Sequence, residues 1–185
     1  MIKVYKGEMK SMPDLSFSIT RNDIVGFYNT SIRKEKDICT LLKEKTEKTY
    51  INMHDLAVVG ISKTDLATTY NGYTLYRYLF EKTNATENKD YLVDGMLQLA
   101  ELSEYKAELI QNLNFKERYR LEIIAALLQE ADLIILHDLF EIAWDSLMHT
   151  LLKEASLLLS IIVFSRGERC TMHDFPIHYY DLKRL

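Results

Sequence analysis

The stretch that most constrains the fold is residues 132–138, together with the helical pattern of residues 115–130 that runs into it. Four large apolar residues at 133–136 are followed at once by His137 and Asp138. A short apolar run of this kind predicts a buried strand, and in an open parallel sheet ligands bind at the carboxyl ends of the strands. The sequence therefore predicts a buried central strand with a candidate site at its end.

Composition limits the class of protein. A chain of 185 residues suits one domain with a real core, and 48% hydrophobic with 27% charged residues is typical of a globular protein. The net charge of -4 gives no dominant basic face, so we expect no nucleic-acid partner. No apolar run reaches the ~18 residues of a membrane span, and no signal peptide is visible, so we expect no direct membrane insertion. Cys39 and Cys170 have neither disulfide nor zinc spacing, which favours a cytoplasmic protein.

Strands and helices alternate along most of the chain. Strands are predicted at residues 2–5, 15–19, 24–28, 49–51, 57–61, 133–136 and 158–164, and helices at 32–45, 74–82, 89–102, 115–130 and 143–155. The alternation implies parallel crossover connections and therefore an α/β fold in three layers. Residues 65–113 contain no strong strand, which predicts a helical insertion, and almost nothing is expected after the last strand.

Several strings resemble the ATP-binding subunits of ABC transporters, in the order that this family has them. LEIIAALLQEADLIIL at 121–136 is similar to the helix after the signature motif and the Walker B strand, and NDIVGF at 22–27 resembles the strand before the Walker A loop. Residues 74–79 resemble the segment that opens the helical subdomain, and residues 161–165 resemble the strand before the switch histidine.

The resemblance implies an α/β, RecA-like P-loop NTPase fold of the ABC ATPase type, with a mainly parallel sheet and an inserted helical subdomain. We expect a single domain over residues 1–185. Its core would span 1–63 and 118–185, and its helical subdomain 64–117.

The Walker A positions depart from the family pattern G-x-x-x-x-G-K-[ST]. The matching positions hold Asn29, Lys34, Glu35 and Lys36. A carboxylate in place of the lysine would repel a triphosphate, and the missing glycines remove backbone freedom from the phosphate cradle. Either these charges form a solvated helix start, which we favour, or Lys34 or Lys36 takes over the phosphate role. We predict that the loop at 29–36 is shortened or continuous with its helix.

The other motif positions depart as well. At Walker B, His137 replaces the magnesium-binding aspartate, and Asp138 stands in place of the catalytic glutamate, one methylene shorter. Arg166 takes the switch-histidine position and cannot act as a base, because its pKa exceeds ~12. Lys63 is matched to the glutamine that links nucleotide and helical subdomain.

The signature motif Leu-Ser-Gly-Gly is replaced at residues 113–116. Asn114 and Phe115 take the places of the serine and the first glycine, and the resemblance implies that bulky Phe115 obstructs contact with the γ-phosphate across a dimer. Trp144 and Asp145 follow the Walker B segment, and we expect them at a subunit interface.

Two groups of residues contain metal-ligand types. His137 and Asp138, with His173 or His178, could form one site, but adjacent strand residues point to opposite faces, so a structural histidine is favoured. A second group, Cys170, His173 and Asp174, is not a tetrahedral zinc set. No metal and no cofactor is therefore predicted.

The favoured hypothesis is a non-hydrolysing partner or regulatory subunit of an ABC transporter, in preference to an enzyme. Its expected partners are an ABC permease, an active ABC ATPase subunit, or a second copy in a homodimer. We expect it in the cytoplasm, at the inner face of the membrane through a partner. The alternatives are a true ATP-hydrolysing subunit with an atypical site, which would bind ATP and Mg²⁺, and a stand-alone oligomeric regulator or scaffold.

Overall fold

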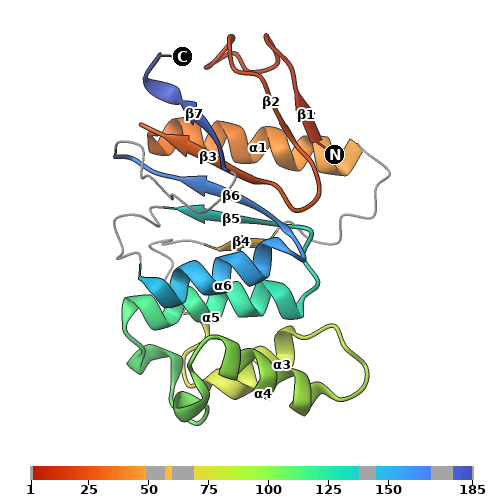
Figure 1. The fold of residues 1–185 in the computed structure, drawn as a ribbon, viewed down its shortest axis with the longest axis vertical. Coiled ribbons are helices and arrows are strands. Elements are labelled where there is room, and N and C mark those ends of the chain that lie inside the picture. Colours follow the sequence, from red (N-terminus) through yellow and green to blue (C-terminus); the bar gives the residue numbers. More distant parts are fainter. Residues whose placement is uncertain (1, 49–56, 60–68, 138–144, 168–176, 185) are drawn as a thin grey trace.

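The computed structural model describes residues 2–48, 57–59, 69–137, 145–167 and 177–184 (Figure 1). Its main feature is a parallel sheet with the strand order β4-β5-β6-β3-β7. The strands are β3 (Ile24–Tyr28), β4 (Ala57–Val59), β5 (Leu133–His137), β6 (Ser160–Phe164) and β7 (Ile177–Asp181). A separate antiparallel hairpin pairs β1 (Ile2–Val4) with β2 (Phe17–Ile19).

Five α-helices and three short 3₁₀ helices are described alongside the sheet. They are α1 (Ile32–Lys48), α3 (Leu75–Lys82), α4 (Lys89–Leu99), α5 (Phe115–Leu128), α6 (Ser146–Ser156), η1 (Ser103–Tyr105), η2 (Ile110–Asn112) and η4 (Leu182–Arg184). Figure 1 shows α5 and α6 between the sheet and the pair α3 and α4, which lie at the opposite end of the molecule from the β1–β2 hairpin.

The sheet separates two hydrophobic cores because successive strand residues point to opposite faces. Val25, Ile135 and Phe164 belong to a core that also contains Ile38 and Leu42 of α1 and the hairpin residues. The alternate strand residues, such as Ile24, Ile134, Leu136 and Val163, belong to a larger core with α3, α4, α5 and α6. The result is the three-layer architecture that the sequence predicts.

Helix and strand ends differ from the predictions by a few residues. The helix predicted at 89–102 ends at Leu99, because Glu101 takes a left-handed conformation with φ 50° and Leu102 donates its N–H to the carbonyl of Leu97. The helix predicted at 143–155 begins at Ser146, where the side chain of Asp145 caps it. The strand predicted at 49–51 lies outside the described residues.

Two expectations about the sheet are wrong. A further strand, β7, follows the last predicted one and pairs in parallel with β3, so the chain continues the sheet after β6. Among the described strands the middle position belongs to β6, and β5 is an interior strand beside it. The proposed boundary at 63/64 lies outside the described residues, and the one at 117/118 falls in the first turn of α5.

Candidate functional site

The site lies where β3, β5 and β6 end and α1 begins. Only residues 29–31 separate β3 from α1, whose first residue is Ile32. Lys34, Glu35 and Lys36 therefore lie in the first turns of the helix, so of the two predicted forms of this loop the structure has the one that is continuous with its helix. In a phosphate-binding loop the backbone amides of this segment would face the anion.

Two backbone amides of this loop are already hydrogen-bonded inside the protein. The N–H of Asn29 donates to the carbonyl of Gly167 at 3.1 Å, and the N–H of Thr30 donates to the carbonyl of Ser165 at 3.0 Å. Asn29 adopts a left-handed conformation with φ 53°, which asparagine tolerates better than most residues. The loop is thereby bound to the segment that follows β6.

Glu35 is buried, with 4% of its surface exposed, so the expectation of a solvated charge at this position is wrong. It lies three and seven residues before Ile38 and Leu42, which places it on the face of α1 that packs on the sheet. The Thr30 hydroxyl donates to its Oε1 at 2.6 Å, and the Nδ1 of His137 lies 2.8 Å from its Oε2. The Nε of Arg166 lies 4.0 Å from Oε1.

These neighbours determine the charge of Glu35. Burial alone would raise the pKa of its carboxyl group, but the hydrogen bonds from His137 and Thr30 and the charges of His137 and Arg166 outweigh burial. The pKa of Glu35 is consequently lowered from its ordinary value of 4.5. The start of α1 thus carries a buried negative charge, at the position that the sequence resemblance matches to the phosphate-binding lysine.

His137 reaches Glu35 because it is the last residue of β5 and points to the same face of the sheet as Leu133 and Ile135. Its ring stacks on that of Phe164, with 5.2 Å between the centroids. Its carbonyl accepts a hydrogen bond from the Tyr119 hydroxyl of α5 at 2.8 Å. The contacts with Glu35 of α1, Phe164 of β6 and Tyr119 of α5 together fix the position of His137.

The two lysines beside Glu35 have different surroundings. The ammonium group of Lys34 donates a hydrogen bond to the carbonyl of Leu182 in η4, whereas Lys36 is exposed. The sequence indicates neither the partner carbonyl of Lys34 nor the role of Thr30. Both contacts depend on tertiary packing, and no local pattern marks them.

The positions matched to the signature motif begin α5. The side chain of Asn114 accepts the N–H of Glu117 at 3.1 Å, and the Glu117 carboxylate accepts the N–H of Asn114 at 2.8 Å. This reciprocal pair is a capping box, which explains why the helix begins here. Phe115 is 40% exposed, and its ring lies 6.3 Å from that of Tyr119.

Of the two predicted interface residues, only Asp145 is described. Its carboxylate caps α6 by accepting the N–H of Met148 at 2.9 Å, and it pairs with Lys116 at 3.4 Å. Lys63, Asp138 and Trp144 lie outside the described residues, as do the candidate zinc ligands Cys170, His173 and Asp174.

His178 does not join His137. It lies in β7, and the strands β6 and β3 separate it from β5, so the two side chains start about 14 Å apart at a strand spacing of about 4.8 Å. Within the described ranges, no three His, Cys, Asp or Glu side chains gather in a group that could hold a metal ion. None of the described helices is long and apolar enough to cross a membrane.

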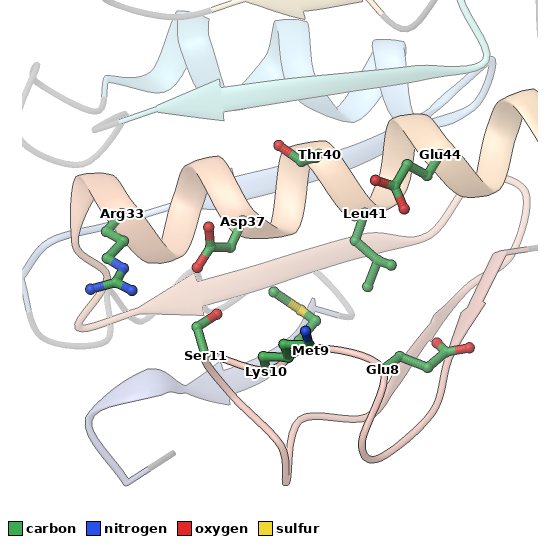
Figure 2. Close-up of a pocket in the computed structure, with 9 residues that line it drawn as sticks. All are labelled: Glu8, Met9, Lys10, Ser11, Arg33, Asp37, Thr40, Leu41 and Glu44. Carbon is green, nitrogen blue, oxygen red and sulfur yellow. The ribbon is translucent and has the colours of Figure 1, made fainter.

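A groove of about 430 Å³ lies on the other side of α1 (Figure 2). Figure 2 shows α1 side chains facing the loop that joins β1 to β2. The lining residues are Glu8, Met9, Lys10, Ser11, Arg33, Asp37, Thr40, Leu41 and Glu44. Their charges are mixed, and no motif in the sequence indicates a groove here.

Comparison with known proteins shows the fold. No family model matches the sequence, and no curated protein matches it. Solved structures do match: a nucleotide-free ATP-binding cassette from an ABC transporter has a TM-score of 0.63 and 16% identity over 97% of this chain and 84% of that chain. The cbiO1 protein of Clostridium perfringens, part of the ABC transporter complex cbiONQ, has a TM-score of 0.61 and 15% identity over 84% and 71%.

A metal-chelate type ABC transporter in an inward-facing conformation has a TM-score of 0.62 and 14% identity, over 83% of this chain and 66% of that chain. This chain therefore spans about two thirds of that subunit's length. The fold is that of the ABC ATPases, an α/β P-loop NTPase fold with a parallel sheet. At these identities the likeness establishes the fold alone.

Proposed function

We propose that this chain is a non-hydrolysing partner or regulatory subunit of an ABC transporter, which works through protein contacts. The single observation that carries the proposal is the buried ionised Glu35, bound to His137 and Thr30. In the family pattern the corresponding pair is a lysine and an aspartate. Here a carboxylate stands at the lysine position and an imidazole at the aspartate position, and the two bind each other instead of phosphate and magnesium.

The electrostatic consequence is large. At an effective dielectric constant of about 20, two unit charges about 4 Å apart interact by about 4 kcal/mol. Without compensation Glu35 would repel an adjacent phosphate charge by up to about that amount, and the positive charge of Arg166 beside it reduces the repulsion. A lysine at the same position would attract the phosphate instead, so the exchange disfavours phosphate by about 4 kcal/mol or more, which is about three powers of ten in Kd.

Several other groups of this segment are already hydrogen-bonded inside the protein. The amides of Asn29 and Thr30 are occupied by protein carbonyls, and the ammonium of Lys34 is directed to the carbonyl of Leu182. Lys36 is exposed, so its attraction for a phosphate is weakened by water and by salt. These contacts argue against an ATP-binding subunit that uses Lys34 or Lys36 in place of the motif lysine.

The expected partners follow from the matched structures, which are parts of transporters. We propose that the chain associates with an ABC permease, an active ABC ATPase subunit, or a second copy of itself. It would act in the cytoplasm, at the inner face of the membrane through that partner. Trp144 and Asp145 remain the residues proposed for the interface.

Titration calorimetry with Mg-ATP tests the absence of nucleotide binding. We expect no heat of binding at micromolar to low millimolar ATP, and no phosphate release by the same preparation. The matched variant is E35K/H137D, which restores the lysine and the aspartate of the family pattern. Micromolar binding of ATP by the unmodified protein would overturn the proposal, and hydrolysis would overturn it completely.

Purification from the native cell, with and without solubilised membrane, tests the partner. Recovery of a permease or an ABC ATPase with the chain supports the proposal. If neither a permease nor an ABC ATPase is recovered in either preparation, the link to a transporter fails, and an oligomer of the chain alone would then favour a stand-alone regulator or scaffold.

A further inference from the structure

We propose that residues 177–184, which form β7 and η4, act as an internal clamp. The clamp binds the side chains of Asn29 and Lys34 and thereby keeps the loop at 29–31 closed. This inference rests on the proposed function, since both concern the same loop. The inference adds that the segment 177–184 controls whether the loop can open. The strand β7 in this segment is the one that was not predicted from the sequence. In Figure 1, β7 and η4 lie beside β3, at the edge of the sheet.

The clamp reaches the loop through the register of β7 on β3. Asp181 lies opposite Tyr28, the residue just before the loop. Its Oδ1 accepts a hydrogen bond from the side-chain amide of Asn29 at 2.9 Å and another from the N–H of Lys183 at 2.9 Å. One carboxylate oxygen thus connects the start of the loop to the start of η4.

The second contact withdraws Lys34 from the loop. Its ammonium group donates to the carbonyl of Leu182, one residue beyond Asp181. A bond from a charged donor is stronger than one between neutral groups, because the charge adds to the dipole interaction. While the clamp is in place, the lysine next to Glu35 on its N-terminal side is used to hold the C-terminal segment.

The clamp is itself fixed to the core. The Leu182 side chain is fully buried, at 0% exposure, in the core that contains Ile38 and Phe27. The Tyr180 ring stacks on Phe27 with 5.4 Å between centroids and is tilted on Phe17 at 5.9 Å. These contacts position the Leu182 carbonyl and the Asp181 carboxylate at the loop, so the two polar contacts close and open together.

The consequence is a loop whose opening depends on the C-terminal segment. Displacement of η4, for example by a partner protein, would free the ammonium of Lys34 and the side-chain amide of Asn29 at the same time. Glu35 and His137 would keep their own hydrogen bond, because that bond involves no residue of the clamp.

Competitive labelling of lysines with acetic anhydride, read by mass spectrometry, tests the clamp. In the unmodified full chain we expect Lys34 to react several-fold more slowly than Lys36, the exposed lysine two residues further along the same helix. The variant Asp181→Ala should raise the Lys34 reactivity roughly five- to tenfold, as expected for loss of the hydrogen bonds that Asp181 accepts from Asn29 and Lys183, and leave Lys36 unchanged. Hydrogen exchange of the amides at 29–35 should rise by a similar factor.

Asn29→Gly is the second variant, because glycine keeps the left-handed backbone while removing the amide that Asp181 binds. It should accelerate exchange at 29–35 as Asp181→Ala does. Asp94→Ala, which removes an exposed carboxylate 2.5 Å from Lys106, is the matched control and should change neither readout.

Equal reactivity of Lys34 and Lys36 in the unmodified chain would overturn the clamp, as would unchanged exchange at 29–35 in both variants. Either result would leave the Mg-ATP titration unaffected, because that titration depends on Glu35. Conversely, ATP binding by the unmodified chain would overturn the proposed function whatever the reactivity of Lys34.

Discussion

Two glutamates on opposite sides of the sheet have pKa values shifted in opposite directions. Glu35 of α1 lies in the core beside the hairpin, where its pKa is lowered. Glu122 of α5 lies on the other side, partly buried under α3, and burial raises its pKa to about 7. Near pH 7 the same side chain is therefore ionised in one core and only about half ionised in the other.

The difference lies in the neighbours. Each Glu35 oxygen has a donor, from Thr30 or His137, and Arg166 adds a positive charge. Glu122 accepts the Tyr78 hydroxyl at 3.3 Å, and this bond together with the attraction of Lys82 does not offset desolvation. A buried carboxylate stays charged only where hydrogen bonds and opposite charges replace the lost water. Thr30, His137 and Arg166 supply that replacement around Glu35, and the core around Glu122 does not.

The largest expected effect comes from Glu35→Lys. A lysine would be buried against His137 and Arg166 without an acceptor, so we expect the free energy of unfolding to fall by about 3–5 kcal/mol. Urea denaturation measures it. Adding His137→Asp should recover most of the loss, because the pair is then restored with exchanged charges. A single-variant loss below about 1 kcal/mol would show that the Glu35 network is dispensable.

Glu122→Gln should stabilise the protein at pH 8, by roughly 2 kcal/mol. The folded-state pKa of about 7 lies above the ordinary 4.5, so the folded state binds more protons and stability falls as pH rises from 4.5 to 7. A tenfold change in proton affinity corresponds to about 1.4 kcal/mol, and loss of the bond to Tyr78 reduces the gain. The advantage should vanish near pH 4, as followed by urea denaturation across this range.

Glu35→Gln is the matched control for that measurement, and its effect on the free energy of unfolding should have the opposite sign. Because its folded-state pKa is lowered, the Glu35 carboxylate contributes stability above pH 4.5 that is lost as pH falls through the folded-state value. The variant should therefore be less stable at pH 7 and approach the unmodified chain in acid. Effects of the same sign for the two variants would remove the contrast between the two cores.

Asn114→Ala should lower the free energy of unfolding by about 1 kcal/mol, because it removes the cap of α5, the helix that carries Glu122. Asn114→Asp keeps the acceptor and should retain most of the stability. Thermal unfolding by circular dichroism distinguishes them. The Tyr119 hydroxyl of α5 binds the carbonyl of His137, so a change in the pKa of Glu35, measured by NMR titration, would show that loosening α5 reaches the Glu35 network through this bond.

Glu130→Gly should give the smallest effect, a gain of about 0.5–1 kcal/mol. Glu130 follows α5 in a left-handed conformation with φ 54°, which glycine adopts without strain. Glu154→Gly in α6 is the control, since an exposed helical position loses about 1 kcal/mol on the same change. Denaturation midpoints compare the two, and a loss of stability in Glu130→Gly would contradict the conformational argument.

The sequence predicted the layers of the molecule because apolar periodicity is local. The runs at β3, β5 and β6 are buried on both faces, and an uninterrupted apolar run needs no knowledge of its partners. The edge strand β7 was missed, because Ile177–Asp181 mixes one aliphatic residue with polar and aromatic ones. A strand at the sheet edge needs less apolar surface, so its pattern is weaker.

The residues of the candidate site could be located from the sequence, but their burial, ionisation and contacts could not be predicted from it. The Walker A and Walker B positions identify Glu35 and His137, yet a glutamate between two lysines on a helix is solvated by default. Its lowered pKa depends on a histidine 102 residues away, at the end of β5, and on the turn that brings Thr30 beside it. The resemblance read from the sequence alone pointed to Glu35 and His137 as the side chains of the candidate site. Only the tertiary structure decided that they pair with each other, because desolvation and hydrogen bonding act between residues that the fold, and not the chain order, brings together.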